Sequence, residues 1–226
     1  MRNNVHRFVG FSLVCICAGS VLAYAEPQLY ETGPSEESSY VRFVNATGNA
    51  IAITSSQGSA KVELTTGAEG RASRFFPVKS GSKLSATIQS DSRKVSVDVV
   101  GKPWEYITIA VLPSGATQIK TSLVRETPTD FNAMRSSLAL FNLDAKCGGA
   151  VMQGGAKSVT ILEKVKPFSV QRRLVNPVKL TAAIVCDGQA AGTAVDLSQL
   201  QAGERYSVFL LTLKNARQAF FVRDAN

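Results

Sequence analysis

Histidine is almost absent from this chain of 226 residues, which contains only His6. That residue lies in a segment that we expect to be removed on export. Without histidine, neither a Ser-His-Asp nor a Cys-His arrangement can be assembled, because the usual base that activates the nucleophile is missing. The commonest transition-metal ligand is missing too, and two cysteines alone cannot form a structural zinc site. The composition therefore predicts a protein that is not an enzyme and that uses no metal or cofactor.

Aromatic platforms and long apolar runs are also scarce. The single tryptophan, Trp104, disfavours a sugar-cleaving enzyme, whose cleft usually carries several aromatic residues. The apolar run from Phe8 to Leu22 is shorter than the roughly 20 residues of a membrane-spanning helix. It follows Arg2 and Arg7 and precedes the small-x-small pattern of residues 23–25. We therefore expect residues 1–25 to be a signal peptide and the chain to be exported, with an uncleaved N-terminal anchor as the alternative.

Cysteine is scarce once this leader is removed, because only Cys147 and Cys186 remain. In an oxidising compartment, two cysteines indicate one disulfide. A bridge over this separation would stabilise the fold by about 4 kcal/mol in the chain-entropy model. A free reactive thiol and an intermolecular bridge are the alternatives.

What the sequence does contain is a succession of short alternating runs within a globular composition, 45% hydrophobic and 19% charged. A period of two, with turn residues about every 8 to 12 positions, is typical of strands with one buried face. No segment has a persuasive helical stripe, and Leu197–Gly203 could form at most one helical turn. The pattern predicts an all-β fold. The clearest alternating runs are Tyr40–Asn45, Ala50–Ile53, Lys61–Leu64, Lys94–Val99 and Tyr106–Val111.

The pattern occurs twice along the chain, which indicates an internal repeat. We predict two tandem antiparallel β-sandwich domains, at residues 40–124 and 137–226, joined by a linker at 125–136. An acidic, turn-rich extended arm at 26–39 precedes them, and one large continuous sandwich is the alternative. The matches are Tyr40-Val-Arg-Phe43 with Leu138-Ala-Leu-Phe141, Val97-Asp98 with Val195-Asp196, and Pro77-Val-Lys79 with Pro177-Val-Lys179, at offsets of 98, 98 and 100.

The net charge is +8, and it falls to +6 when Arg2 and Arg7 leave with the leader. An exported basic protein could meet an anionic polysaccharide, an anionic membrane face or an acidic partner. Nucleic acid is not an expected partner, because the RNA-reading aromatic motifs are absent. Most such charges form a solvated face, so this observation favours a polyanion only weakly.

The arm and the first alternating run resemble the start of the mature AlgF family, the periplasmic accessory proteins of bacterial alginate O-acetylation. Those proteins open with a Leu-Tyr-Gly-Pro-like arm that leads into a Phe-Val-Arg-x-x-Asn strand. The chain departs from that pattern in Glu31-Thr32 and in its two cysteines. The residues that carry the resemblance are Leu29-Tyr30, Gly33-Pro34, Ser39-Tyr-Val-Arg-Phe-Val-Asn45 and Asn176-Pro-Val-Lys179.

The resemblance implies a periplasmic adaptor required for O-acetylation of an exopolysaccharide, with alginate as the expected polymer. Its partners would be membrane-bound and periplasmic O-acetylation proteins, and it would organise acetyltransferases rather than transfer acetyl itself. The functional alternative is a carbohydrate-binding module that grips the anionic polysaccharide directly, with binding that weakens as ionic strength rises. The candidate partner contacts are Leu29, Tyr30, Gly33, Pro34, Arg42 and Asn45, unless these residues only complete the fold.

Overall fold

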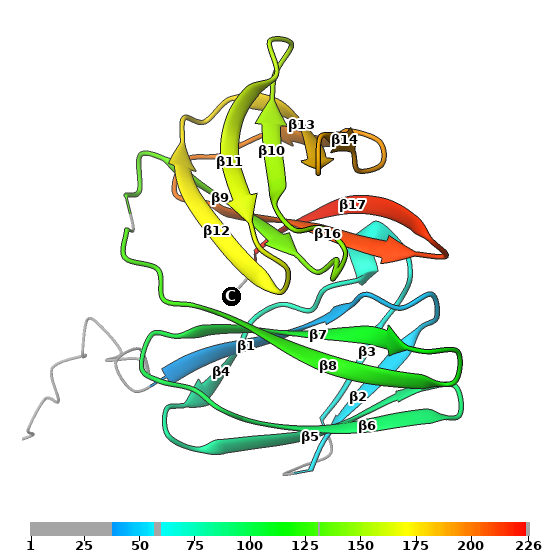
Figure 1. The fold of residues 1–226 in the computed structure, drawn as a ribbon. Helices are drawn as coiled ribbons and strands as arrows, with labels where there is room; N and C mark the ends of the chain where they lie inside the picture. The colour runs from blue at the N-terminus through cyan, green and yellow to red at the C-terminus, as the bar shows by residue number, and fades with distance from the viewer. Residues whose placement is uncertain (1–37, 57–59, 131, 225–226) are drawn as a thin grey trace, which may run out of the picture. The chain divides into compact units, whose positions relative to one another are not determined.

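Strands account for nearly all of the regular structure in the computed structural model, which describes residues 38–56, 60–130 and 132–224 (Figure 1). The predicted all-β fold is confirmed. The one helical element among these residues is a 3₁₀ turn, η1, at Ala68–Gly70. Leu197 to Gln199, expected to form at most a helical turn, belong to a strand. None of the described helical residues forms a segment long and apolar enough to cross a membrane.

The first half of the described chain forms two sheets of four strands. The first inner sheet has the order β4-β1-β7-β8, and the first outer sheet has the order β3-β2-β5-β6. Their bounds are β1 Ser38–Asn45, β2 Ile51–Ser55, β3 Lys61–Leu64, β4 Phe76–Lys79, β5 Lys83–Ser90, β6 Arg93–Val100, β7 Tyr106–Ser114 and β8 Gln118–Glu126.

The second half repeats this topology. The second inner sheet has the order β12-β9-β16-β17, and the second outer sheet has the order β11-β10-β13-β14, with β15 also paired to β13. Their bounds are β9 Ser136–Asn142, β10 Ala150–Gly154, β11 Val159–Val165, β12 Ser169–Val175, β13 Lys179–Cys186, β14 Gln189–Ala190, β15 Val195–Gln199, β16 Arg205–Leu213 and β17 Ala216–Arg223.

Each inner sheet contains one parallel pair, which the prediction of antiparallel sandwiches missed. β1 runs parallel to β7, with Tyr40 opposite Tyr106, and β9 runs parallel to β16, with Leu138 opposite Tyr206. An alternating pattern identifies a strand but carries no information about the direction of its neighbour. The four strands of these pairs are almost completely buried, as expected for parallel strands covered on both faces.

Three apolar layers hold the sheets together. One lies within the first half around Ile88 and Ile109, and another lies within the second half around Leu140 and Met152. The third lies between the two inner sheets and combines residues of both halves, including Phe141 and Phe209, whose rings stack with centroids 4.8 Å apart. The described residues of the segment 33–226 belong to one compact unit. The division into two separate domains stays a prediction.

A buried asparagine ends the first strand of each half. The amide nitrogen of Asn45 donates to the carbonyl oxygens of Asn49 and Thr65 at 2.8 and 2.9 Å, and its oxygen accepts the N–H of Thr47 at 2.9 Å. The amide nitrogen of Asn142 likewise donates to Cys147 O and Val165 O, and its oxygen accepts the Asp144 N–H. Each side chain replaces water for backbone groups that the fold buries.

We expect Asn45→Ala to lower the free energy of unfolding by about 2 kcal/mol, because it leaves buried backbone groups unpaired. Urea unfolding followed by circular dichroism measures this loss. Asn49→Ala is the matched control, because the exposed Asn49 side chain donates only to the exposed carboxylate of Asp91. Equal losses in the two variants would contradict the role assigned to Asn45.

Candidate functional site

Five ionisable side chains gather between the two inner sheets, and we call them the interlayer charge cluster. They come from five places in the sequence: β1, the end of β8, β12, β16 and the residue after β17. All five side chains are at most 14% exposed. The members are Arg42, Glu126, Arg172, Arg205 and Asp224.

Arg42 crosses from the first inner sheet to the second. Its Nη1 donates to Asp224 Oδ1 at 2.6 Å, its Nη2 to Ser207 Oγ at 2.9 Å and its Nε to Thr108 Oγ1 at 2.9 Å. The guanidinium carbon lies 4.4 Å from the ring centroid of Phe75, and two further rings of the third apolar layer lie at 4.9 Å. The guanidinium therefore gains hydrogen bonds and cation–π contacts in place of water.

Arg172 joins the halves a second time. Its Nε and Nη2 donate to the two carboxylate oxygens of Glu126 at 3.0 and 2.9 Å, a bidentate pair, and Nη2 also reaches Asp224 Oδ2 at 3.3 Å. Arg205 donates to Glu126 at 3.2 Å and lies 4.5 Å from the ring centroid of Tyr106. Both carboxylates are thus shared between two arginines.

The cluster shifts the pKa values of its members in different directions. Burial alone would raise the pKa of Asp224, but the charges of Arg42 and Arg172 and the Ser207 hydroxyl outweigh burial, so that pKa is lowered. Burial lowers the pKa of Arg42 and of Arg205, while the nearby carboxylates raise that of Arg172 despite its burial. Three arginines face two carboxylates, so the cluster carries one positive charge in excess.

The cluster holds its groups in fixed pairings that leave no activated nucleophile. Ser207 is fully buried; its hydroxyl donates to Asp224 Oδ2 at 3.0 Å and accepts from Arg42. A carboxylate with a lowered pKa is a poor proton acceptor near neutral pH. This arrangement can fix how the two halves pack against each other, which is a structural rather than a chemical task.

Two grooves open beside the cluster. The strand-edge groove, of about 620 Å³, runs along Ala219 to Asp224. The linker groove, of about 510 Å³, lies between β12 and the segment that follows β8. The other residues lining the strand-edge groove are Arg42, Ala68, Glu69, Ala72, Ser73, Arg74, Thr193, Ala194 and Val195.

The strand-edge groove exposes unpaired backbone groups. β17 is the last strand of its sheet, and the N–H of Asp224 donates to Arg205 O at 2.8 Å across the β16–β17 ladder. Because the direction alternates along a strand, the N–H and C=O groups of Ala219, Phe221 and Arg223 point away from β16. Within the described ranges, these outward groups have no hydrogen-bond partner. The groove can therefore accept a further extended chain.

The structure places only two of the six predicted partner contacts. Arg42 is 1% exposed, although it lines the strand-edge groove, and Asn45 is fully buried. Both side chains make hydrogen bonds within the fold, as the alternative expected, and a role in partner contact stays a prediction. Leu29, Tyr30, Gly33 and Pro34 lie outside the described residues.

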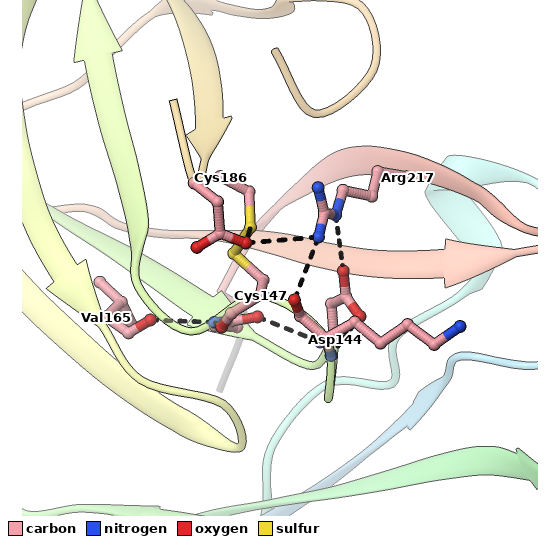
Figure 2. Close-up of a disulfide and its surroundings, with 8 residues drawn as sticks. Asp144, Cys147, Val165, Cys186 and Arg217 are labelled. Carbon is pink, nitrogen blue, oxygen red and sulfur yellow. Dashed lines mark hydrogen bonds and ion pairs between the residues drawn. A yellow bond between two sulfur atoms is a disulfide. The ribbon is translucent and has the colours of Figure 1, made fainter. Parts of the chain in front are cut away.

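The predicted Cys147–Cys186 disulfide is confirmed, with Cα atoms 5.6 Å apart (Figure 2). It ties the loop after β9 to the end of β13, and both residues are fully buried. Beside it, Arg217 bridges Asp144 at 2.8 Å and Asp187 at 3.6 Å. Burial alone would raise the pKa of Asp144. The hydrogen bonds from Arg217 and from the Lys146 N–H outweigh burial, so the pKa is lowered.

Sequence reasoning missed most of the interlayer charge cluster. The positive charges of the chain are mostly expected on a solvated face, yet the Arg172 side chain is only 12% exposed. A signal existed in the repeat: Val124-Arg125-Glu126 and Val222-Arg223-Asp224 match at the same offset of 98. Both carboxylates of the cluster therefore occupy equivalent places at the ends of β8 and β17. A single sequence does not reveal which arginines they meet.

No protein-family model matches the chain, and no curated protein matches it. Solved structures similar to it include a candidate cell adhesion protein from Bacteroides uniformis, at 12% identity and a TM-score of 0.29, covering 84% of this chain and 98% of that one. A candidate cell adhesion protein from Bacteroides ovatus has 9% identity and a TM-score of 0.26, with 83% and 95% covered. At these TM-scores the likeness carries no argument about function.

Proposed function

We propose that this chain is a periplasmic, non-catalytic adaptor required for O-acetylation of an exopolysaccharide, with alginate as the polymer. The proposed process, O-acetylation, rests on the resemblance to the AlgF family. The strand-edge groove is the observation that favours contact with a partner protein. An adaptor must offer its partners a surface with specific complementarity. The outward N–H and C=O groups of Ala219 and Phe221 offer hydrogen bonds to an extended segment of a partner protein.

The walls of the groove favour a slender partner segment. Ala72 and Ser73 line one part of it and Thr193 and Ala194 another, so a lone extended chain has room beside β17. A main chain added to β17 would extend the second inner sheet by one strand. The backbone ladder would supply affinity and the flanking side chains specificity.

The experiment is an in-frame deletion in the source organism, with the acetyl content and the yield of secreted polysaccharide measured together. We expect acetyl groups to be lost while polymer yield persists, and the gene in trans to restore them. Unchanged acetylation in the deletion strain would reject the proposed function.

Complementation with Ala219→Pro tests the groove within the same strain. Proline removes the outward N–H and leaves the ladder to β16 intact, so we expect acetylation to fall severalfold with little change in the unfolding midpoint. Ala219→Ser keeps the N–H at nearly the same size and should complement fully. Full complementation by Ala219→Pro would remove the groove from the mechanism.

The second candidate function is a carbohydrate-binding module that grips the anionic polysaccharide directly. The net charge of +6 expected once the leader with Arg2 and Arg7 is removed favours it weakly. It predicts salt-sensitive binding of purified protein to alginate, whereas an adaptor acting through protein contacts alone predicts a stable complex with O-acetylation proteins and little affinity for polymer.

A further inference from the structure

Trp104 is the single tryptophan of the chain, and it is 41% exposed on the loop between β6 and β7. Its φ angle is 63°, in the left-handed region that bulky side chains rarely adopt. Such strain persists only where the surroundings impose it, and it concentrates at functional sites. Eight other described non-glycine residues share a positive φ, so the exposure of this large ring is the feature that the hydrophobic cores do not explain.

The loop around Trp104 is held at several points. The Trp104 N–H donates to Ser38 O at 2.9 Å, and the Lys102 N–H donates to a carboxylate oxygen of Glu105 at 2.9 Å. The Gly81 N–H donates to Gly101 O at 2.9 Å, which ties the loop to the turn between β4 and β5. The ring is therefore attached to a fixed backbone, and binding a ligand would cost little entropy for ordering the loop.

Positive charges flank this loop. Lys102 is exposed two residues before Trp104, and the exposed Lys79 pairs in register with Ser38, whose carbonyl accepts the Trp104 N–H. Arg125, 39% exposed, donates to Val100 O at 3.2 Å and to Glu105 at 2.8 Å. The Glu105 carboxylate is buried and paired with Arg125, and among the described residues Lys102 and Lys79 are exposed charges beside this loop.

We propose that Trp104 is a stacking platform for a sugar ring of an anionic polysaccharide. The C–H face of a pyranose is apolar and slightly positive, which suits the electron-rich face of an indole. Lys102 and Lys79 would attract the carboxylates of neighbouring uronate units. The choice of alginate rests on the proposed function, whereas the platform itself does not. An adaptor with this platform would hold its polymer loosely beside the enzymes that it organises.

Fluorescence of the exported chain, excited beyond the tyrosine absorption band, tests the platform directly, because the signal then arises from Trp104 alone. We titrate with alginate oligosaccharides of eight uronate units and, in parallel, with cello-oligosaccharides of equal length. We expect a saturable change in emission with the uronates that weakens as salt is added. No change with either sugar would overturn the proposal. A change with the neutral sugar alone would keep a platform but reject both the anionic ligand and alginate as the polymer.

Variants separate stacking from folding. Affinity electrophoresis through alginate should show about a tenfold loss of affinity for Trp104→Ala and a smaller loss for Lys102→Ala. Val159→Ala, at a site 61% exposed on β11, is the control and should bind as the parent does. Unfolding curves confirm that each variant is folded. Unchanged affinity in a folded Trp104→Ala variant would overturn the proposal, whatever the acetylation phenotype of the deletion strain.

Discussion

Replacing Asp224 with alanine is expected to lower the free energy of unfolding by about 3–5 kcal/mol, the cost of breaking a buried ion pair by removing one partner. Its carboxylate is 1% exposed and bonds Arg42 at 2.6 Å and Arg172 at 3.3 Å. Without it, one more positive charge stays uncompensated between the inner sheets. Urea unfolding at neutral pH, followed by circular dichroism, measures the loss.

Two controls separate burial from charge. Glu204→Ala breaks the exposed pair with Arg223 and should change stability little, because solvent screens exposed ion pairs. Replacing Arg42 and Asp224 together by apolar residues should cost less than Asp224→Ala alone, because both charges leave the interior. A double variant as unstable as the sum of the two single variants would contradict a direct interaction between them.

The same variant should remove part of the acid sensitivity. The pKa of Asp224 is lower in the folded protein than in the unfolded chain, so its contribution to stability is complete above the unfolded pKa. That contribution is lost as the pH falls through the folded value. The difference in stability between the parent and Asp224→Ala should therefore shrink as the pH falls below the ordinary carboxyl range.

The sequence predicted strands well and pairing poorly, for a physical reason. Alternation in Tyr40–Asn45 reflects burial on one face, and the structure confirms a strand there as β1. The opposite face, assigned to solvent, carries Arg42 into a third apolar layer, because the second inner sheet covers it. An arginine in an alternating strand is expected on an exposed face unless a carboxylate that pairs with it is known. The carboxylate that pairs with Arg42 belongs to Asp224, 182 residues away, so the sequence does not reveal the pair.

The interlayer charge cluster is better explained by specificity than by stability. A buried ion pair gains little over an apolar contact of the same volume, but it penalises every misplaced arrangement. The third layer is otherwise built of interchangeable apolar side chains such as Val44, Ala110 and Phe209. Arg42 is satisfied only where Asp224, Thr108 and Ser207 meet it together. We therefore expect the cluster to select one register between the two inner sheets.

Removing the disulfide is expected to cost about 4 kcal/mol, the chain-entropy value for a separation of 39 residues. In the first half, Ser90 at the end of β5 takes the place of Cys186 at the end of β13, and its hydroxyl donates to Ala50 O at 3.2 Å. The covalent link therefore lies within the second half, and its removal should act on that half directly. Urea unfolding of Cys147→Ala/Cys186→Ala by circular dichroism measures the cost, and an unchanged midpoint would contradict it.

The same double variant shows whether the halves unfold together. Trp104, the single tryptophan, lies in the first half, far along the chain from both cysteines. If the interlayer charge cluster couples the halves, the unfolding midpoint measured by Trp104 fluorescence should fall together with the midpoint measured by circular dichroism. A Trp104 fluorescence midpoint that stays at the parent value would mean that the two halves unfold as independent domains. In that case Asp224→Ala, made in the disulfide-bonded protein, should also leave the fluorescence midpoint unchanged. Coincident shifts in both variants would mean that the third apolar layer and its five charges make the two halves one cooperative unit.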